Sequence, residues 1–322
     1  MSYLKDKFCG ALVGTQVGDS LGMPVEGASS FFIKEYYGEI REMLEARSGA
    51  GTYTDDTEMA VAVAESLERS RGFDGADMAS AFLENFNPER GYGAGTIKAL
   101  TLIQQGERWD EAGKRIFNGG SYGNGAAMRI APVGCLYYRD LEKVKEIAQE
   151  SSRITHAHQL GMEGAAVQAC GIALAISMDP QQELDAEEYI STLLQVPAYD
   201  SPFREKLQVV RELLHKDVPV EELLSQLGND VSSLNSVPTA IYSFLKYNYD
   251  FEEALVFAVG LGGDTDTIGA MTGALTGSYR GKSSIPERWL RTVEKGEKGI
   301  DYIENLALKL YNLHKELYGE TG

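Results

Sequence analysis

The sequence is poor in cysteine, in positive charge and in long apolar runs, and each shortage argues against a class of protein. Its three cysteines, Cys9, Cys135 and Cys170, form no CxxC pair, which favours reduced core residues of a cytoplasmic protein over a disulfide scaffold. Lys and Arg number 30 against 48 Asp and Glu, a net charge of −18, which argues against direct binding of nucleic acid. Apolar stretches such as 172–176 are too short to span a membrane, and the first residues lack the order of a signal peptide.

Apolar residues recur with a helical period along almost the whole chain, and sustained β-branched alternation is missing. Helices are predicted over 4–17, 57–70, 77–87, 95–105, 141–152, 159–177, 186–195, 204–214, 220–227, 237–247, 251–259, 267–279, 287–293 and 300–317. Prolines such as Pro238 are expected where a helix starts or stops, because proline lacks a backbone N–H. The sequence therefore predicts an all-α, compact single domain spanning 1–322, with roughly a dozen orthogonally packed helices.

Two glycine stripes run through predicted helices at intervals of four residues. They are Gly10, Gly14, Gly18 and Gly22, and Gly269, Gly273, Gly277 and Gly281. A glycine in a helix interior costs about 1 kcal/mol relative to alanine, so the stripes predict a compensating close approach of two buried helices. Gln16 and Asp19 argue against a membrane dimerisation face. The approach would bring Asp19 and Glu26, expected after the first helix, near Asp264 and Asp266.

Two short acidic clusters, Thr54-Asp55-Asp56-Thr57 and 263–267, stand where helices are expected to begin. Asp264 and Asp266 would point about 200° apart on a continuous helix, so they can act together only on a loop or a helix cap. Carboxylate and hydroxyl oxygens suit Mg²⁺ and are accepted by Mn²⁺. Either cluster alone is also explained by helix capping, but the two together favour one shared metal site.

Two glycine-rich segments, 91–96 and 119–129, each open a predicted helix. Glycines before a helix let backbone N–H groups converge on an anion, aided by the helix N-terminus. The aromatic residues Tyr92, Phe117 and Tyr122 in or beside these segments would suit the base of a nucleotide. The alternatives are tight turns with close helix packing for the glycines, and core packing for each aromatic ring.

Histidine and nucleophile patterns add little. His156 and His158 could cap the helix that follows them, and they lack Cys or Glu partners at the spacing of a zinc site. The chain shows no serine nucleophile elbow and no context for a reactive cysteine.

With these motifs in hand, the chain resembles the ADP-ribosylglycohydrolase family, and within it the (ADP-ribosyl)hydrolase 3-like branch. The segments that carry the resemblance are Gly18-Asp19 with Glu26, and 53–57, 91–95, 121–125, 155–157, 236–242 and 261–267. The resemblance runs over most of the chain. The two acidic clusters are highly specific for the family, and the glycine-aromatic loops with 236–242 favour the branch.

The resemblance implies an all-α fold with a central cleft that holds two Mg²⁺ (or Mn²⁺) ions and ADP-ribose. The metal ligands would be Thr54, Asp55, Asp56, Asp264, Asp266 and Thr267. The substrate-binding residues would be Gly91, Gly93, Gly95, Phe117, Gly120, Ser121, Tyr122, Gly123, Asn124, Gly125 and His156. Glu26 would be the general acid/base, with Asp55 and Asp56 also catalytic.

The implied reaction is metal-dependent hydrolysis of the C1″ glycosidic bond of an ADP-ribose-containing substrate. That substrate is an ADP-ribosylated protein side chain, poly(ADP-ribose) or O-acetyl-ADP-ribose, and the protein is expected to act as a monomer. One alternative is a binuclear-metal hydrolase or phosphatase of another nucleotide. The other is a non-catalytic ADP-ribose binder, which would have no need of four convergent carboxylates.

Overall fold

The helical period of the sequence becomes an all-helical structure. The computed structural model describes residues 3–46 and 49–319, and within them β-type pairing is limited to two isolated bridges, Ser29 with Gly262 and Gly123 with Ser232. The predicted ends of the domain, residues 1–2 and 320–322, lie outside the described residues. The α-helices are α1 (Tyr3–Gly22), α2 (Ser30–Tyr36), α3 (Asp55–Ser70), α4 (Gly75–Asn85), α5 (Ala94–Gln104), α6 (Trp109–Ala112), α7 (Ala131–Leu136), α8 (Leu141–Ser152), α9 (Gln159–Ser177), α10 (Ala186–Leu193), α11 (Pro202–Leu214), α12 (Val220–Leu227), α13 (Ser233–Lys246), α14 (Phe251–Gly260), α15 (Thr265–Arg280), α16 (Glu287–Thr292) and α17 (Ile300–Tyr318). Five single 3₁₀ turns join them: η1 (Met23–Val25), η2 (Pro88–Arg90), η3 (Gly113–Arg115), η4 (Asn124–Ala126) and η5 (Lys282–Ser284).

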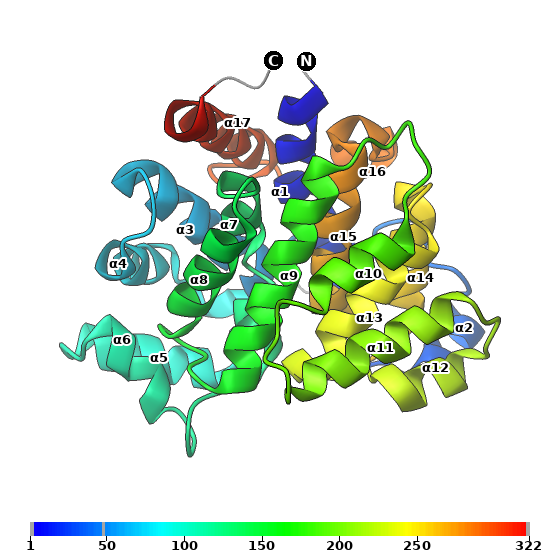
Figure 1. Ribbon diagram of the computed structural model, residues 1–322, viewed down its shortest axis with the longest axis horizontal. Coiled ribbons are helices and arrows are strands. Elements are labelled where there is room, and N and C mark those ends of the chain that lie inside the picture. The colour runs from blue at the N-terminus through cyan, green and yellow to red at the C-terminus, as the bar shows by residue number, and fades with distance from the viewer. Residues whose placement is uncertain (1–2, 47–48, 320–322) are drawn as a thin grey trace.

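Helices α1 and α15 form the centre of the fold, with the other helices around them (Figure 1). They run antiparallel with their backbones almost touching. A Cβ added to Gly10, Gly14 or Gly18 would lie 2.0–2.2 Å from a glycine carbonyl oxygen of α15. The predicted close approach of the two glycine stripes is therefore confirmed. It places the C-terminal end of α1 beside the N-terminal end of α15.

Two predicted details of the helices are wrong. Helix α1 continues to Gly22, so Asp19 lies inside a helix and not after it, because Gly18 serves the contact with α15 and does not end the helix. Pro238 lies inside α13. The residues 236–245 of that helix are buried throughout, and this packing outweighs the hydrogen bond that proline removes.

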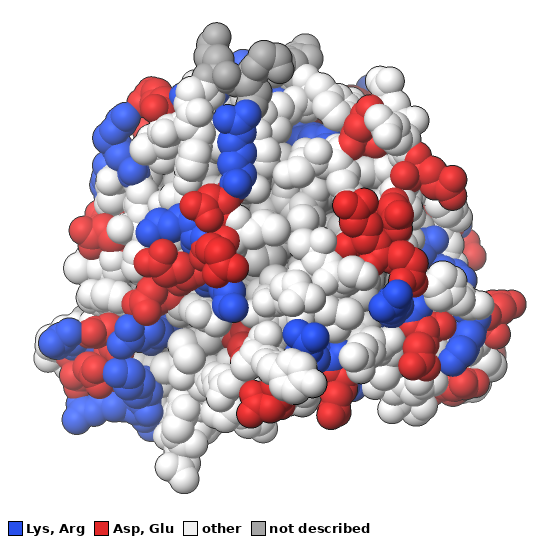
Figure 2. Space-filling view, in the orientation of Figure 1, with Lys and Arg blue, Asp and Glu red and all other residues white. Residues whose placement is uncertain are grey.

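The distribution of charged side chains and the burial of the most apolar helix follow from the composition of the chain. Figure 2 shows acidic and basic side chains interspersed on the face in view. Helix α9 is long and apolar enough to cross a membrane, but 78% of its apolar window is buried inside the protein. It therefore packs as a core helix between α8 and α15.

Candidate metal and nucleotide site

The first acidic cluster forms the start of α3. Thr54 is its N-cap, and the Thr54 hydroxyl accepts a hydrogen bond from the Asp56 N–H at 3.3 Å. Asp19, fully buried in α1, accepts hydrogen bonds from the backbone N–H groups of Thr54 and Thr57 at 3.0 and 3.1 Å, and from the Thr57 hydroxyl at 2.5 Å. Asp19 thus fixes the start of α3 against α1, which sets the direction of Asp55 and Asp56.

The second acidic cluster follows a glycine turn that only glycine fits. Gly263 has a φ of +76°, and a Cβ there would lie 2.1 Å from the carbonyl oxygen of Asn229. The same turn is hydrogen-bonded to the segment after Glu26, through Gly27 N–H to Gly263 O and Gly263 N–H to Ala28 O, both 2.8 Å. Glu26 is thereby held beside the start of α15.

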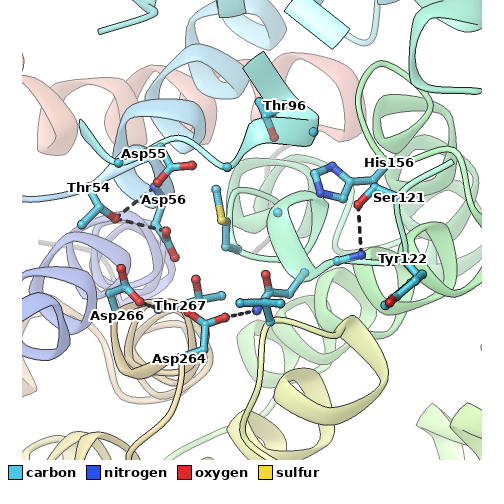
Figure 3. Close-up of a pocket in the computed structure, with 18 of the residues that line it drawn as sticks. Thr54, Asp55, Asp56, Thr96, Ser121, Tyr122, His156, Asp264, Asp266 and Thr267 are labelled. Atoms are coloured by element: carbon cyan, nitrogen blue, oxygen red, sulfur yellow. Dashed lines mark hydrogen bonds between the residues drawn. The ribbon is translucent and has the colours of Figure 1, made fainter. Parts of the chain in front are cut away.

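Carboxylates from three segments converge here. One oxygen each of Glu26, Asp264 and Asp266 lie within 4.8 Å of one another. Asp55 and Asp56 of α3 face Asp264 and Asp266 of α15 across a hollow (Figure 3). The Asp264 carboxylate also accepts a hydrogen bond from the side-chain amide of Asn124 at 2.5 Å, so the second cluster is tied to the glycine-rich segment 119–129.

Asp56, Asp264 and Asp266 are buried next to one another, and Asp55 is partly buried beside them. Burial, together with the charge of Asp19, raises the pKa of Asp55 to about 8. Burial and the neighbouring aspartates raise the pKa of Asp56 and Asp266 well above the ordinary range. Arg90, the arginine that lines the same cavity, forms its ion pairs with Glu58 and Glu294 instead.

The donor set fits a hard divalent cation. Asp56 Oδ1 is buried and has no hydrogen-bond partner among the described residues, and a buried carboxylate oxygen left in this way is costly unless a cation neutralises it. The hydroxyls of Thr54 and Thr267 line the cavity beside the carboxylates. Six such oxygen donors could hold one or two Mg²⁺ or Mn²⁺ ions.

The other end of the cavity is built from glycines. Gly119 and Gly120 have φ values of +96° and +95°, and a Cβ on Gly120 would lie 2.5 Å from the backbone nitrogen of His158. The Gly123 N–H donates to the Ser121 hydroxyl at 3.2 Å, and Figure 3 shows this pair beside His156 and Tyr122. The turn can therefore approach a ligand closely with its backbone, as a diphosphate requires.

His156 is a neutral group in this wall. Burial and the nearby Arg129 lower the pKa of His156 to about 3, and its Nδ1 lies 2.8 Å from the Thr155 hydroxyl. A Cβ on Gly125 would lie 2.6 Å from the imidazole, so the ring packs directly on the glycine turn. Phe117 and Tyr122, 68% and 57% exposed, stand at the open side, where a planar base could stack on them.

The structure brings every site residue predicted from the sequence to one cavity of about 650 Å³. Lining it are Glu26, Thr54, Asp55, Asp56, Gly91, Gly93, Gly95, Phe117, Gly120, Ser121, Tyr122, Gly123, Asn124, Gly125, His156, Asp264, Asp266 and Thr267. Their roles as ligands and catalysts stay predictions.

The residues that line the same cavity without having been predicted as site residues are Arg90, Thr96, Asn118, Met128, His158 and Val231. His158 was expected to cap a helix, and it does: its side chain accepts a hydrogen bond from the Leu160 N–H at 3.1 Å at the start of α9. All of these residues except Val231 lie within or next to the sequence motifs, so their proximity to a motif could have identified them as cavity residues. Val231 had no such signal, because it reaches the cavity through the pairing of Asn124 N–H with Val231 O at 3.0 Å.

Comparison with known proteins agrees with this geometry. A sequence model of the ADP-ribosylglycohydrolase family matches residues 1–319. The chain is 36% identical to ADP-ribosylhydrolase ARH3 of Gallus gallus over 349 residues, covering 96% of this chain and 93% of that protein. It is 32% identical to the human ARH3 over 351 residues, covering 96% and 94%. Among solved structures, an ADP-ribosylglycohydrolase-related protein complex matches with a TM-score of 0.77 and 29% identity, covering 98% of this chain and all of that one.

Proposed function

The chain belongs to the ADP-ribosylglycohydrolase family and is a glycoside hydrolase, and from this premise we propose that it releases ADP-ribose from ADP-ribosylated molecules in a metal-dependent reaction. The bond cleaved would be the C1″ glycosidic bond to a protein side chain, to another ribose in poly(ADP-ribose) or to an acetyl group. Within that class, the surface beside the cavity favours the linkage to a protein side chain.

One observation carries the proposal: a single cavity joins a cluster of buried carboxylates to a glycine turn flanked by exposed aromatic rings. A nucleotide that carries a second ribose has matching parts in the same order. Its adenine would stack on Tyr122, its diphosphate would meet the N–H groups of 119–125, and its distal ribose would reach Asp56 and Asp266. A phosphatase or a plain nucleotide hydrolase needs no second sugar between the diphosphate and the carboxylates.

The two metal cations proposed for the acidic end would be held by Thr54, Asp55, Asp56, Asp264, Asp266 and Thr267. When bound, such cations supply Lewis-acid polarisation of oxygen atoms and offset negative charge. Within the part of the chain that the structure describes, Asp56 Oδ1 is buried and has no hydrogen-bond partner, which supports a cation at this position.

The chain's own residues would supply the remaining chemistry. Glu26 lies within the acidic cluster and is exposed to the cavity, so its carboxyl oxygen can move a proton to or from water or the leaving group. His156, held neutral by burial, can contact a ribose or phosphate oxygen without adding charge. Asp19 would position the start of α3 and would not touch the substrate.

Product analysis tests the proposal. The protein is incubated with Mg²⁺ or Mn²⁺ and with serine-linked, arginine-linked, polymeric and O-acetyl ADP-ribose, and the products are separated by chromatography. Intact ADP-ribose is the expected product. Release of AMP or inorganic phosphate instead would favour hydrolysis of another nucleotide bond, and tight binding of ADP-ribose without any product would favour a non-catalytic binder.

We also propose a cytoplasmic monomer. Cys9, Cys135 and Cys170 are all free and buried, as is usual in a reducing compartment. All residues proposed for the site come from one chain. Size-exclusion chromatography with light scattering would test the monomer, and a tagged copy followed in cells would test the compartment.

A further inference from the structure

Exposed aromatic side chains gather on α2, outside the cavity. Phe31 and Tyr36 are 71% and 73% exposed, and Phe32 and Tyr37 are about half exposed. The rings of Phe32 and Tyr36 stack with their centroids 4.3 Å apart. Ile33 is the residue by which this short helix is anchored in the core. A helix that presents four aromatic rings to water is typical of a contact surface for a partner.

A second cavity of about 780 Å³ lies beside this aromatic surface, between α2, the beginning of α12 and α14. These three helices lie on the right side of Figure 1. We call it the α2 groove. Phe31 contributes an apolar wall, and four carboxylates line it against a single lysine. These charged residues are Lys34, Glu35, Glu39, Glu221 and Glu253. Arg41 forms ion pairs with Glu39 and Glu253, so the remaining negative charge of the groove comes from Glu35 and Glu221.

The α2 groove shares two wall segments with the candidate active site. Glu26 lines the active-site cavity, and Ser30 and Phe31, a few residues later, line the groove. Likewise Leu261 lines the groove, and Asp264 lines the active-site cavity. The backbone bridge between Ser29 and Gly262 holds the two segments together. The groove therefore adjoins the carboxylate end of the cavity, opposite Tyr122.

We propose that the α2 groove docks a cationic segment of the protein that carries the ADP-ribose. This rests on the proposed function, in which the group released from C1″ leaves at the carboxylate end. An apolar side chain of the segment would lie on Phe31, and its lysines or arginines would face Glu35 and Glu221. A poly(ADP-ribose) chain leaving at the same end carries diphosphates, which the carboxylates of the groove repel. The groove therefore favours protein-linked ADP-ribose over the polymer.

The distance sets the length of segment required. Ser30 is the fourth residue after Glu26, so their Cα atoms lie at most about 14 Å apart. A peptide that leaves the active site beside Glu26 therefore needs at most roughly four extended residues to reach Ser30 at the edge of the groove.

The test uses matched ADP-ribosyl peptides, made in both serine and arginine linkage. One carries Lys, Arg and Leu about four to eight residues from the acceptor, and its partner carries Glu and Ser there. The wild type is expected to show a kcat/KM about tenfold higher for the basic peptide, with a ratio that falls as salt is added. The double variant Glu35→Lys/Glu221→Lys should abolish this ratio, and Phe31→Ala should reduce it. Hydrolysis of O-acetyl-ADP-ribose, which has no peptide, should be unchanged in both variants.

Matched controls separate docking from general changes in charge or surface. Glu142→Lys/Glu183→Lys reverses two exposed carboxylates outside the groove, and Tyr199→Ala removes a side chain that is 90% exposed. Both should keep the wild-type ratio. Equal cleavage of the two peptides by the wild type, or an unchanged ratio in Glu35→Lys/Glu221→Lys, would overturn the proposal.

Direct binding distinguishes failure of the docking surface from failure of the proposed reaction. Fluorescence anisotropy of the labelled basic peptide without ADP-ribose measures the groove alone. Binding that is lost in Glu35→Lys/Glu221→Lys would support the α2 groove even if no substrate were cleaved. Absence of both binding and peptide preference, with O-acetyl-ADP-ribose still cleaved, would overturn the groove and leave the proposed function standing.

Discussion

The contact between α1 and α15 makes a quantitative prediction for Gly14→Ala. The new Cβ would lie 2.2 Å from the carbonyl oxygen of Gly273 and 2.8 Å from its carbon. An ordinary contact needs more than 3 Å, so the helices must separate by about 1 Å or their backbones must bend. Overpacking of this kind costs about 1–3 kcal/mol. The atoms in the way belong to the backbone of a long helix and cannot move aside as a side chain can, so we expect a cost near the upper end of that range.

A compensating gain must be subtracted. Alanine is about 1 kcal/mol better than glycine in a helix interior, so the net loss for Gly14→Ala is about 2 kcal/mol. This corresponds to a fall in Tm of roughly 4–8 °C for a large domain. Gly260→Ala is the control, because a Cβ there meets nothing within 4 Å. It should be neutral or stabilise by up to about 1 kcal/mol.

Thermal unfolding followed by circular dichroism, with urea titration as a second measure, tests the pair of variants. A Gly14→Ala protein as stable as the wild type would refute the reasoning from the close approach. Equal losses in Gly14→Ala and Gly260→Ala would also refute it, since glycine flexibility and not packing would then be the cause.

Four further predictions concern the site. Asp266→Asn should abolish turnover while circular dichroism stays unchanged, because an amide binds a hard cation far more weakly than a carboxylate does; full activity would contradict the shared metal site. Glu26→Gln should lower kcat by about 10²-fold or more with ADP-ribose affinity retained in calorimetry, and a parallel loss of affinity would make Glu26 a positioning residue. Tyr122→Ala should weaken ADP-ribose binding by roughly 1–3 kcal/mol, the range for base stacking on an aromatic ring; unchanged affinity would place the base elsewhere. In EDTA the protein should lose stability as pH rises from about 4 to 8, because the pKa of Asp55 is raised from 3.8 to about 8, so the stabilisation is complete below the unfolded pKa and disappears above the folded one. Mg²⁺ should restore Tm at pH 8 more than at pH 5, and a flat Tm in EDTA would contradict the raised pKa.

The sequence by itself determined the helical class, the two glycine stripes and the positions of the acidic and glycine-rich clusters. These are local properties. Helical periodicity follows from the pattern of apolar residues, and glycine at every fourth position is unfavourable unless another backbone lies against it. Motifs such as Asp55-Asp56 and Asp264-Thr265-Asp266 also indicate a metal site by their residue types alone.

The tertiary structure decided what those local patterns could not. Asp19 was expected after a helix and lies within one, because Gly18 allows the close packing of α1 on α15 and does not end the helix. Val231 reaches the active-site cavity only through backbone pairing with 123–124, a contact between segments about a hundred residues apart that no local pattern encodes. The same holds for the raised pKa values of the aspartates and for the groove beside α2. Both exist only when helices that are distant in the sequence enclose the same space. Burial and the field of neighbouring charges depend on position in the fold and not on order along the chain.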